Sequence, residues 1–130
     1  MSIYNGRTSD DVLNGYLGII RLAECGKDAR SAMANSVQRC YELAKIKVGG
    51  ALVPQSSISE HTNRILSAYF GEEVRDALKT GLQLCYTARN ITPSATANSL
   101  FNQLIEAQTG EGLKNGILMC IVRCCQEVNS

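Results

Sequence analysis

The sequence predicts one all-α domain of about six helices spanning residues 1–130. Apolar residues recur at intervals of three and four along most of the chain, whereas the strict alternation typical of half-buried strands is absent. Proline, which interrupts helices, occurs only at positions 54 and 93. A chain of 130 residues can bury one modest core, so a second domain is not expected.

The first helix is predicted to begin at Thr8 or Ser9, because either hydroxyl can cap a first turn. Asp10 and Asp11 would then lie in that turn, where the helix dipole favours negative charge. The predicted apolar face consists of Leu13, Leu17, Ile20 and Leu22. We expect this helix to end at Gly26, since glycine is typical of the position after a helix.

A second helix is predicted from about residue 27 to residue 47, before the helix-breaking pair Gly49-Gly50. Its predicted buried face consists of Ala29, Met33, Val37, Cys40, Tyr41 and Ala44. After a loop over residues 51–57, Ser57 or Ser59 can cap a third helix. The apolar residues of that helix are Ile58, Ile65, Leu66, Tyr69 and Phe70.

Three further helices are separated by turn-forming residues. The fourth follows Gly71 and is predicted to end at Asn90, with an apolar face of Val74, Leu78, Leu82, Cys85 and Tyr86. Thr92 and Pro93 predict the start of the fifth, whose buried residues are Ala97, Leu100, Phe101, Leu104 and Ile105. After a turn at residues 109–110, the sixth presents Leu113, Ile117, Cys120, Ile121, Cys124 and Val128.

Charge and hydropathy argue against two classes of partner. The 13 basic and 12 acidic side chains are scattered singly and give a net charge of +1, so there is no basic stripe for nucleic acid or anionic lipid. The amino-terminal residues do not resemble a leader, and no apolar run is long enough for a membrane span. We therefore expect a protein of a cytosol-like compartment that does not insert into membranes.

Six cysteines raise the question of disulfides or a metal site. Cys120 and Cys124 would share one helical face, but zinc needs about four ligands. Cys25, Cys40 and Cys85 are remote single residues, and the sequence contains no CxxC pair. The prediction is reduced thiols that pack as small apolar groups, with no metal.

No set of residues predicts an enzyme. The only histidine, His61, has no recognisable nucleophile and acid around it, and Gly49-Gly50 lacks the Lys-Ser/Thr of a phosphate-binding loop. Arg75 and Asp76 could hold the propionates and ring nitrogens of a tetrapyrrole. Because adjacent helical residues point in different directions, a solvated face is the simpler interpretation of that pair.

Most of the chain after its first helix resembles the β subunits of phycobiliproteins. The stretch GLQLCYTARNITPSA at 81–95 is similar to the family's penultimate helix, turn and Thr-Pro helix start, through Gly81, Leu82, Tyr86, Thr92 and Pro93. The last helix is similar to the family's closing helix through Leu113, Ile117, Ile121, Arg123, Cys125 and Val128. Earlier matching positions are Ala29, Asn35, Tyr41, Gly49-Gly50, Phe70-Gly71 and Val74, so the resemblance covers residues 27–130.

This resemblance implies a globin-like fold that pairs with a related helical subunit, forms rings on the photosynthetic membrane surface and carries open-chain bilins. The family attaches bilin through a cysteine followed shortly by Arg-Asp, yet residues 51–70 and 109–112 contain no cysteine. A bilin would therefore have to use Cys85, Cys40 or Cys25, with Arg75 and Asp76 as further candidate contacts.

The predicted function is a structural, regulatory or atypically bilin-binding subunit of a light-harvesting assembly, with either an open-chain bilin or no cofactor. Two alternatives stay open. One is a pigment-free helical protein-interaction module, in which the cysteines only fill the core. The other is a globin-like haem sensor that uses His61.

Overall fold

A computed structural model describes residues 8–23, 26–68, 71–107 and 110–130. These ranges form six α-helices and contain no strand, which confirms the prediction of an all-α chain. The helices are α1 (Asp11–Leu22), α2 (Gly26–Val48), α3 (Gln55–Ser67), α4 (Gly71–Arg89), α5 (Ala95–Glu106) and α6 (Gly110–Val128).

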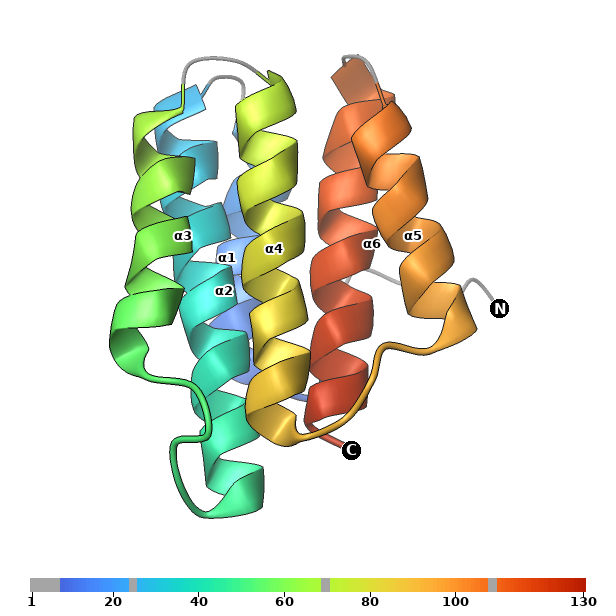
Figure 1. Cartoon of the computed structure of the whole chain (residues 1–130). Helices are drawn as coiled ribbons and strands as arrows, with labels where there is room; N and C mark the ends of the chain where they lie inside the picture. The colour runs from blue at the N-terminus through green and yellow to red at the C-terminus, as the bar shows by residue number, and fades with distance from the viewer. Residues whose placement is uncertain (1–7, 24–25, 69–70, 108–109) are drawn as a thin grey trace.

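The helices stand side by side around α2 and α4 (Figure 1). Helix α2 packs against α1, α3, α4 and α6, while α4 packs against α2, α3, α5 and α6. The core draws on every helix, as shown by the buried residues Leu17, Tyr41, Ile58, Leu82, Phe101 and Ile121. The two central helices therefore connect all the others into one core.

Helix α1 begins one or two residues later than predicted, with Asp10 rather than Thr8 or Ser9 as its cap. The Asp10 carboxylate accepts a hydrogen bond of 2.9 Å from the backbone N–H of Leu13 and also binds the Arg39 guanidinium of α2. The helix ends at Leu22, so the predicted end at Gly26 is wrong, and Gly26 instead begins α2.

The prediction that Leu22 belongs to the buried face of α1 is also wrong, because 82% of its surface is exposed. Leu13, Leu17 and Ile20 are buried, whereas position 22 lies on the opposite side of the helix from them. An apolar residue near a helix end was thus assigned to the wrong side.

Helices α2 and α3 differ in how well their limits were predicted. Gly49 takes a positive φ of 71°, and the N–H groups of Gly49 and Gly50 both donate to Lys45 O, so α2 ends as predicted. Helix α3 starts earlier than predicted, after Pro54, so Ser57 and Ser59 lie inside it and are not caps. Leu66 is 47% exposed, and Tyr69 and Phe70 lie outside the described residues.

The last three helices confirm most of their predicted faces. Asn90 ends α4 in a left-handed conformation, with a φ of 63°. The predicted start of α5 at Thr92-Pro93 is wrong, because Ser94 is the cap and accepts a hydrogen bond of 3.1 Å from Ala97 N. Ile105 is 39% exposed, beside buried Leu104, and the predicted turn residue Thr109 lies outside the described residues.

Candidate functional site

Three thiols from three different helices meet at the centre of the core. Cys40 of α2, Cys85 of α4 and Cys124 of α6 are all fully buried, and Cys124 lies beside the other two. The Cys85 thiol donates to Val37 O at 3.5 Å and to Gly81 O at 3.4 Å. Burial raises the pKa of the Cys85 and Cys124 thiols, so both stay neutral near pH 7 and are poor nucleophiles.

The remaining described thiols are buried as well. Cys120 donates to Leu100 O at 3.3 Å, and burial raises the pKa of both Cys120 and Cys125 to about 12. All five described cysteines are free. Within the described ranges, no group of three His, Cys, Asp or Glu residues is arranged to hold a metal ion.

Of the five residues considered for a bilin, Cys25 lies outside the described residues, and the other four do not converge. Arg75 donates a hydrogen bond to Ala107 O at the end of α5, while Asp76 is exposed and accepts one of 2.6 Å from Arg64. Cys85 lies ten residues after Arg75 on the same helix, about 15 Å along its axis. Cys85 and Cys40 share the core, whereas Arg75 and Asp76 lie near one end of α4 and have other partners.

His61 is half-buried on the side of α3 that faces α4. Its Nδ1 lies 3.1 Å from Arg64 Nη1, and its Cβ lies 3.5 Å from where a Cβ on Gly81 would be. That added Cβ would also come within 3.0 Å of Val37 Cγ1. Helices α2, α3 and α4 are therefore tightly packed around Gly81.

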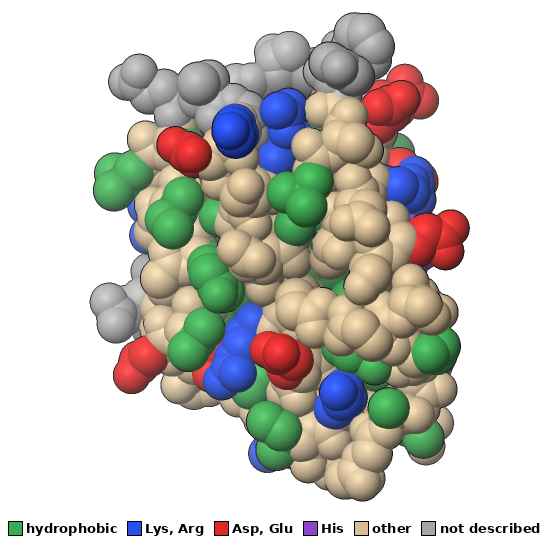
Figure 2. Space-filling model, turned by 90° about the vertical axis from the view of Figure 1, so that its left-hand side faces the viewer, with side chains coloured by type: hydrophobic (Ala, Val, Ile, Leu, Met, Phe, Trp, Pro, Cys, Tyr) green, Lys and Arg blue, Asp and Glu red, His purple; other side chains and the backbone are tan. Residues whose placement is uncertain are grey.

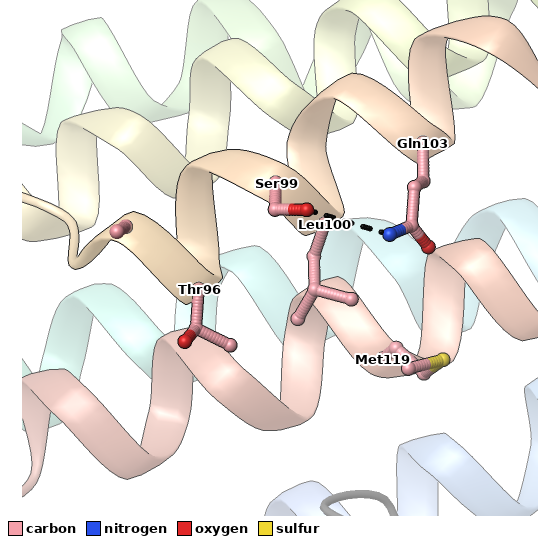
Figure 3. Close-up of a pocket in the computed structure, with 6 residues that line it drawn as sticks. Thr96, Ser99, Leu100, Gln103 and Met119 are labelled. Atoms are coloured by element: carbon pink, nitrogen blue, oxygen red, sulfur yellow. Dashed lines mark hydrogen bonds between the residues drawn. The ribbon is translucent and has the colours of Figure 1, made fainter.

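A shallow hollow of about 380 Å³ lies between α5 and α6 (Figure 3). Thr96, Ser99 and Gln103 line it from α5, and the Gln103 amide donates to Ser99 Oγ at 3.4 Å. Leu100 reaches from α5 toward α6, where Met119 completes the lining. The described lining residues are uncharged, so they supply neither a general base nor an ion-binding group.

Helix α1 carries a second apolar stripe that faces away from the core. Val12, Ile19 and Leu22 are 49%, 47% and 82% exposed and lie on one side of the helix together with Gly15. We call these four residues the α1 strip. Figure 2 shows hydrophobic side chains in a broken row toward its left-hand edge, where α1 lies.

Sequence reasoning missed this surface because it placed Leu22 on the same face as Leu13, Leu17 and Ile20 and assigned Val12 and Ile19 to no face. The signal was present: residues 12, 15, 19 and 22 are spaced by three, four and three, next to the buried set of 13, 17 and 20. One apolar stripe of this 12-residue helix packs into the core of the chain. The other stripe is left on the surface, where another helix can bind it.

Comparison with known protein families, curated proteins and solved structures shows no match. No helix within the described ranges combines the length and apolar character needed to cross a membrane. Other large apolar side chains, such as Ile46 and Leu52, are also exposed, but the α1 strip is a set of them aligned on one side of a single helix.

Proposed function

We propose that this chain is a non-enzymatic helical subunit that associates with another helical protein through the α1 strip. The observation that carries this proposal is the open row of Val12, Ile19 and Leu22 on a helix whose other side already fills the core. Scattered apolar residues are normal on a protein surface, but an aligned set on one helix is typical of a binding surface.

The packing of the core favours the version of this proposal in which the subunit binds no pigment. Cys85 and Cys40 are fully buried, so a thioether bond from either to a bilin would require the central helices to separate. His61 is packed against the Arg64 side chain and the α4 backbone near Gly81, which does not favour axial ligation of haem. A structural or regulatory role therefore agrees better with the geometry than pigment binding does.

The resemblance to phycobiliprotein β subunits supports a narrower version of the proposal. In that version the fold is globin-like, the partner is a related subunit, and the assembly lies on the photosynthetic membrane surface. Four of the matching residues are buried, namely Gly81, Leu82, Tyr86 and Ile121. They therefore support a similar core and not a shared binding surface.

The association is tested by the size of the tagged chain after chemical cross-linking inside its own cells, which retains weak complexes that dilution would dissociate. We expect the wild-type chain in a complex larger than a monomer and Leu22→Asp at the size of a monomer. Leu66→Asp is the matched control, because Leu66 is as exposed as Ile19 but lies on α3. A wild-type monomer, or a complex that survives Leu22→Asp, would contradict the proposal.

The pigment-free form is tested by an absorbance spectrum of the chain purified from the same cells. We expect no visible band. A red-to-green band would indicate a bound bilin and a Soret band would indicate haem, and either would overturn this part of the proposal.

A further inference from the structure

We infer that the partner of the α1 strip is a second copy of this chain, with the two α1 helices paired antiparallel about a two-fold axis. This inference rests on the proposed function of the strip as an association surface. It adds the identity of the partner and the register of the contact, both of which follow from the pattern of residues along α1.

The α1 strip has the spacing of a coiled-coil seam. Val12, Gly15, Ile19 and Leu22 stand at steps of three, four and three, which places them on alternating seam positions of a short helix pair. Leu13, Leu17 and Ile20 point into the core, so the seam is additional to the packing of the monomer.

Gly15 has no role in the packing of the monomer. A Cβ added to it would meet no atom within 4 Å, and the same holds for Gly18. Glycine inside a helix lowers helix stability, so its presence at an open, exposed position needs another reason. Close approach of a second helix backbone or of a large side chain supplies that reason.

The order of large and small residues favours antiparallel pairing of identical helices. In that register Val12 faces the partner's Leu22, and Ile19 lies over the partner's Gly15. The two-fold axis repeats both contacts, so each glycine receives one isoleucine. A parallel pair would instead place Gly15 against the partner's Gly15 and leave a gap in the seam.

Charges at the two ends of α1 agree with the same register. Asp11 is exposed at the amino-terminal end. At the other end, Lys114 of α6 places its Nζ 3.1 Å from Arg21 O and 3.2 Å from Ala23 O. Antiparallel pairing brings Asp11 toward the partner's Lys114 twice, whereas a parallel pair would bring the two Asp11 carboxylates together.

The length of the seam limits the expected affinity of the dimer. From Val12 to Leu22 the helix spans about 15 Å, and one such face buries less than the roughly 800 Å² per partner of a standard stable interface. We therefore expect a weak dimer whose population depends on protein concentration.

The test is sedimentation velocity of the purified full chain from about 10 μM to about 1 mM, a range that brackets weak dimers. The wild-type chain is expected to shift from monomer to dimer. Leu22→Asp is expected to weaken dimerisation at least about tenfold, while Leu66→Asp on α3 leaves it unchanged.

Gly15→Leu separates this inference from a general loss of structure. In the monomer the new side chain meets open space and replaces a poor helix former, so the melting temperature is expected to rise. In the dimer it collides with the partner's Ile19, so dimerisation is expected to weaken about tenfold. Unchanged or stronger dimerisation of Gly15→Leu would overturn the register.

The charge contact is tested by Asp11→Lys and Lys114→Asp. Each alone is expected to weaken the dimer, and the two together to restore it, whereas failure of the double variant to recover would contradict the antiparallel contact. A wild-type chain that stays monomeric to about 1 mM overturns self-association. The proposed function fails separately, if Leu22→Asp leaves the size of the complex cross-linked inside cells unchanged.

Discussion

Ser94 connects the start of α5 to the end of α6 through hydrogen bonds. Its hydroxyl accepts a hydrogen bond from Ala97 N, and it lies 2.5 Å from the Glu127 carboxylate, to which it donates. Ser94→Ala removes both bonds and is expected to lower the free energy of unfolding by about 1–2 kcal/mol, measured by urea denaturation. Thr92→Ala, at the exposed residue that sequence alone predicts as the cap, is the control and should change stability by less than about 0.5 kcal/mol.

Glu127 is expected to make the free energy of unfolding depend on pH in the acidic range. Burial would raise the pKa of its carboxyl, but hydrogen bonds from the Ser94 hydroxyl and N–H and from Arg123 bring it below its usual value. Its contribution is therefore fully present above the unfolded pKa of about 4.3 and is lost as the pH falls through the lower folded value. Asp10 behaves in the same way, because the hydrogen bond from Arg39 lowers its pKa.

We expect the free energy of unfolding to fall as the pH drops from about 5 toward 2, and to fall less steeply in Glu127→Gln. Urea denaturation at a series of pH values measures both slopes. Parallel curves for the wild type and Glu127→Gln would show that Glu127 does not carry this dependence.

The buried thiols are expected to resist modification in the native state. Cys40, Cys85, Cys120, Cys124 and Cys125 are each at most 1% exposed, and attack on a disulfide reagent requires an accessible thiolate. In a Cys25→Ser variant, which removes the one cysteine outside the described residues, an aromatic disulfide reagent should label no thiol in buffer and five in denaturant. Rapid labelling in buffer would show that the core opens enough for attachment at Cys85 or Cys40.

At the scale of the helices, Asn90 shows how a single residue sets an end. With a φ of 63°, it allows its own N–H to donate to Thr87 O and that of Ile91 to donate to Tyr86 O, which completes the last turn of α4. Asn90→Ala should lower the free energy of unfolding by about 1 kcal/mol because alanine is strained at positive φ, while Asn90→Gly should not. Thermal melts of both variants check this difference.

The helices themselves could be predicted from the sequence because their apolar periodicity is long and regular. Their ends were less certain, since several hydroxyls compete for each cap: Ser94, and not Thr92, has the Glu127 carboxylate beside it, and that neighbour comes from a distant part of the chain. The exposure of Leu22 and Leu66 was missed for a related reason. Each lies close in sequence to a buried residue, and only the packed helices decide which of the two points inward.

The candidate site was less predictable than the fold. Sequence reasoning anticipated that Cys85 fills the core, but it could not show that Cys40 and Cys124 meet it there, since they come from α2 and α6. The separation of Arg75 from Asp76 agrees with their adjacent positions on a helix. The α1 strip was readable as a spacing, yet its exposure depended on which side of α1 faces α2.

For the whole molecule, the central position of α4 predicts a single cooperative unfolding transition. Leu82 is fully buried on this helix, which contacts α2, α3, α5 and α6. Leu82→Ala should lower the free energy of unfolding by about 2–5 kcal/mol because it leaves a cavity in the shared core, whereas Leu66→Ala should cost about 0.5 kcal/mol or less.

Far-ultraviolet circular dichroism and thiol exposure in urea provide two probes of that transition, one of helix content and one of the core. Because Cys124 of α6 lies beside Cys40 and Cys85 of the two central helices, loss of α6 packing and loss of the α2–α4 contact should coincide. Both curves are therefore expected to move together in Leu82→Ala. If thiol exposure preceded the loss of helix, α5 and α6 would form a separately unfolding unit, and the single core would be divided in two.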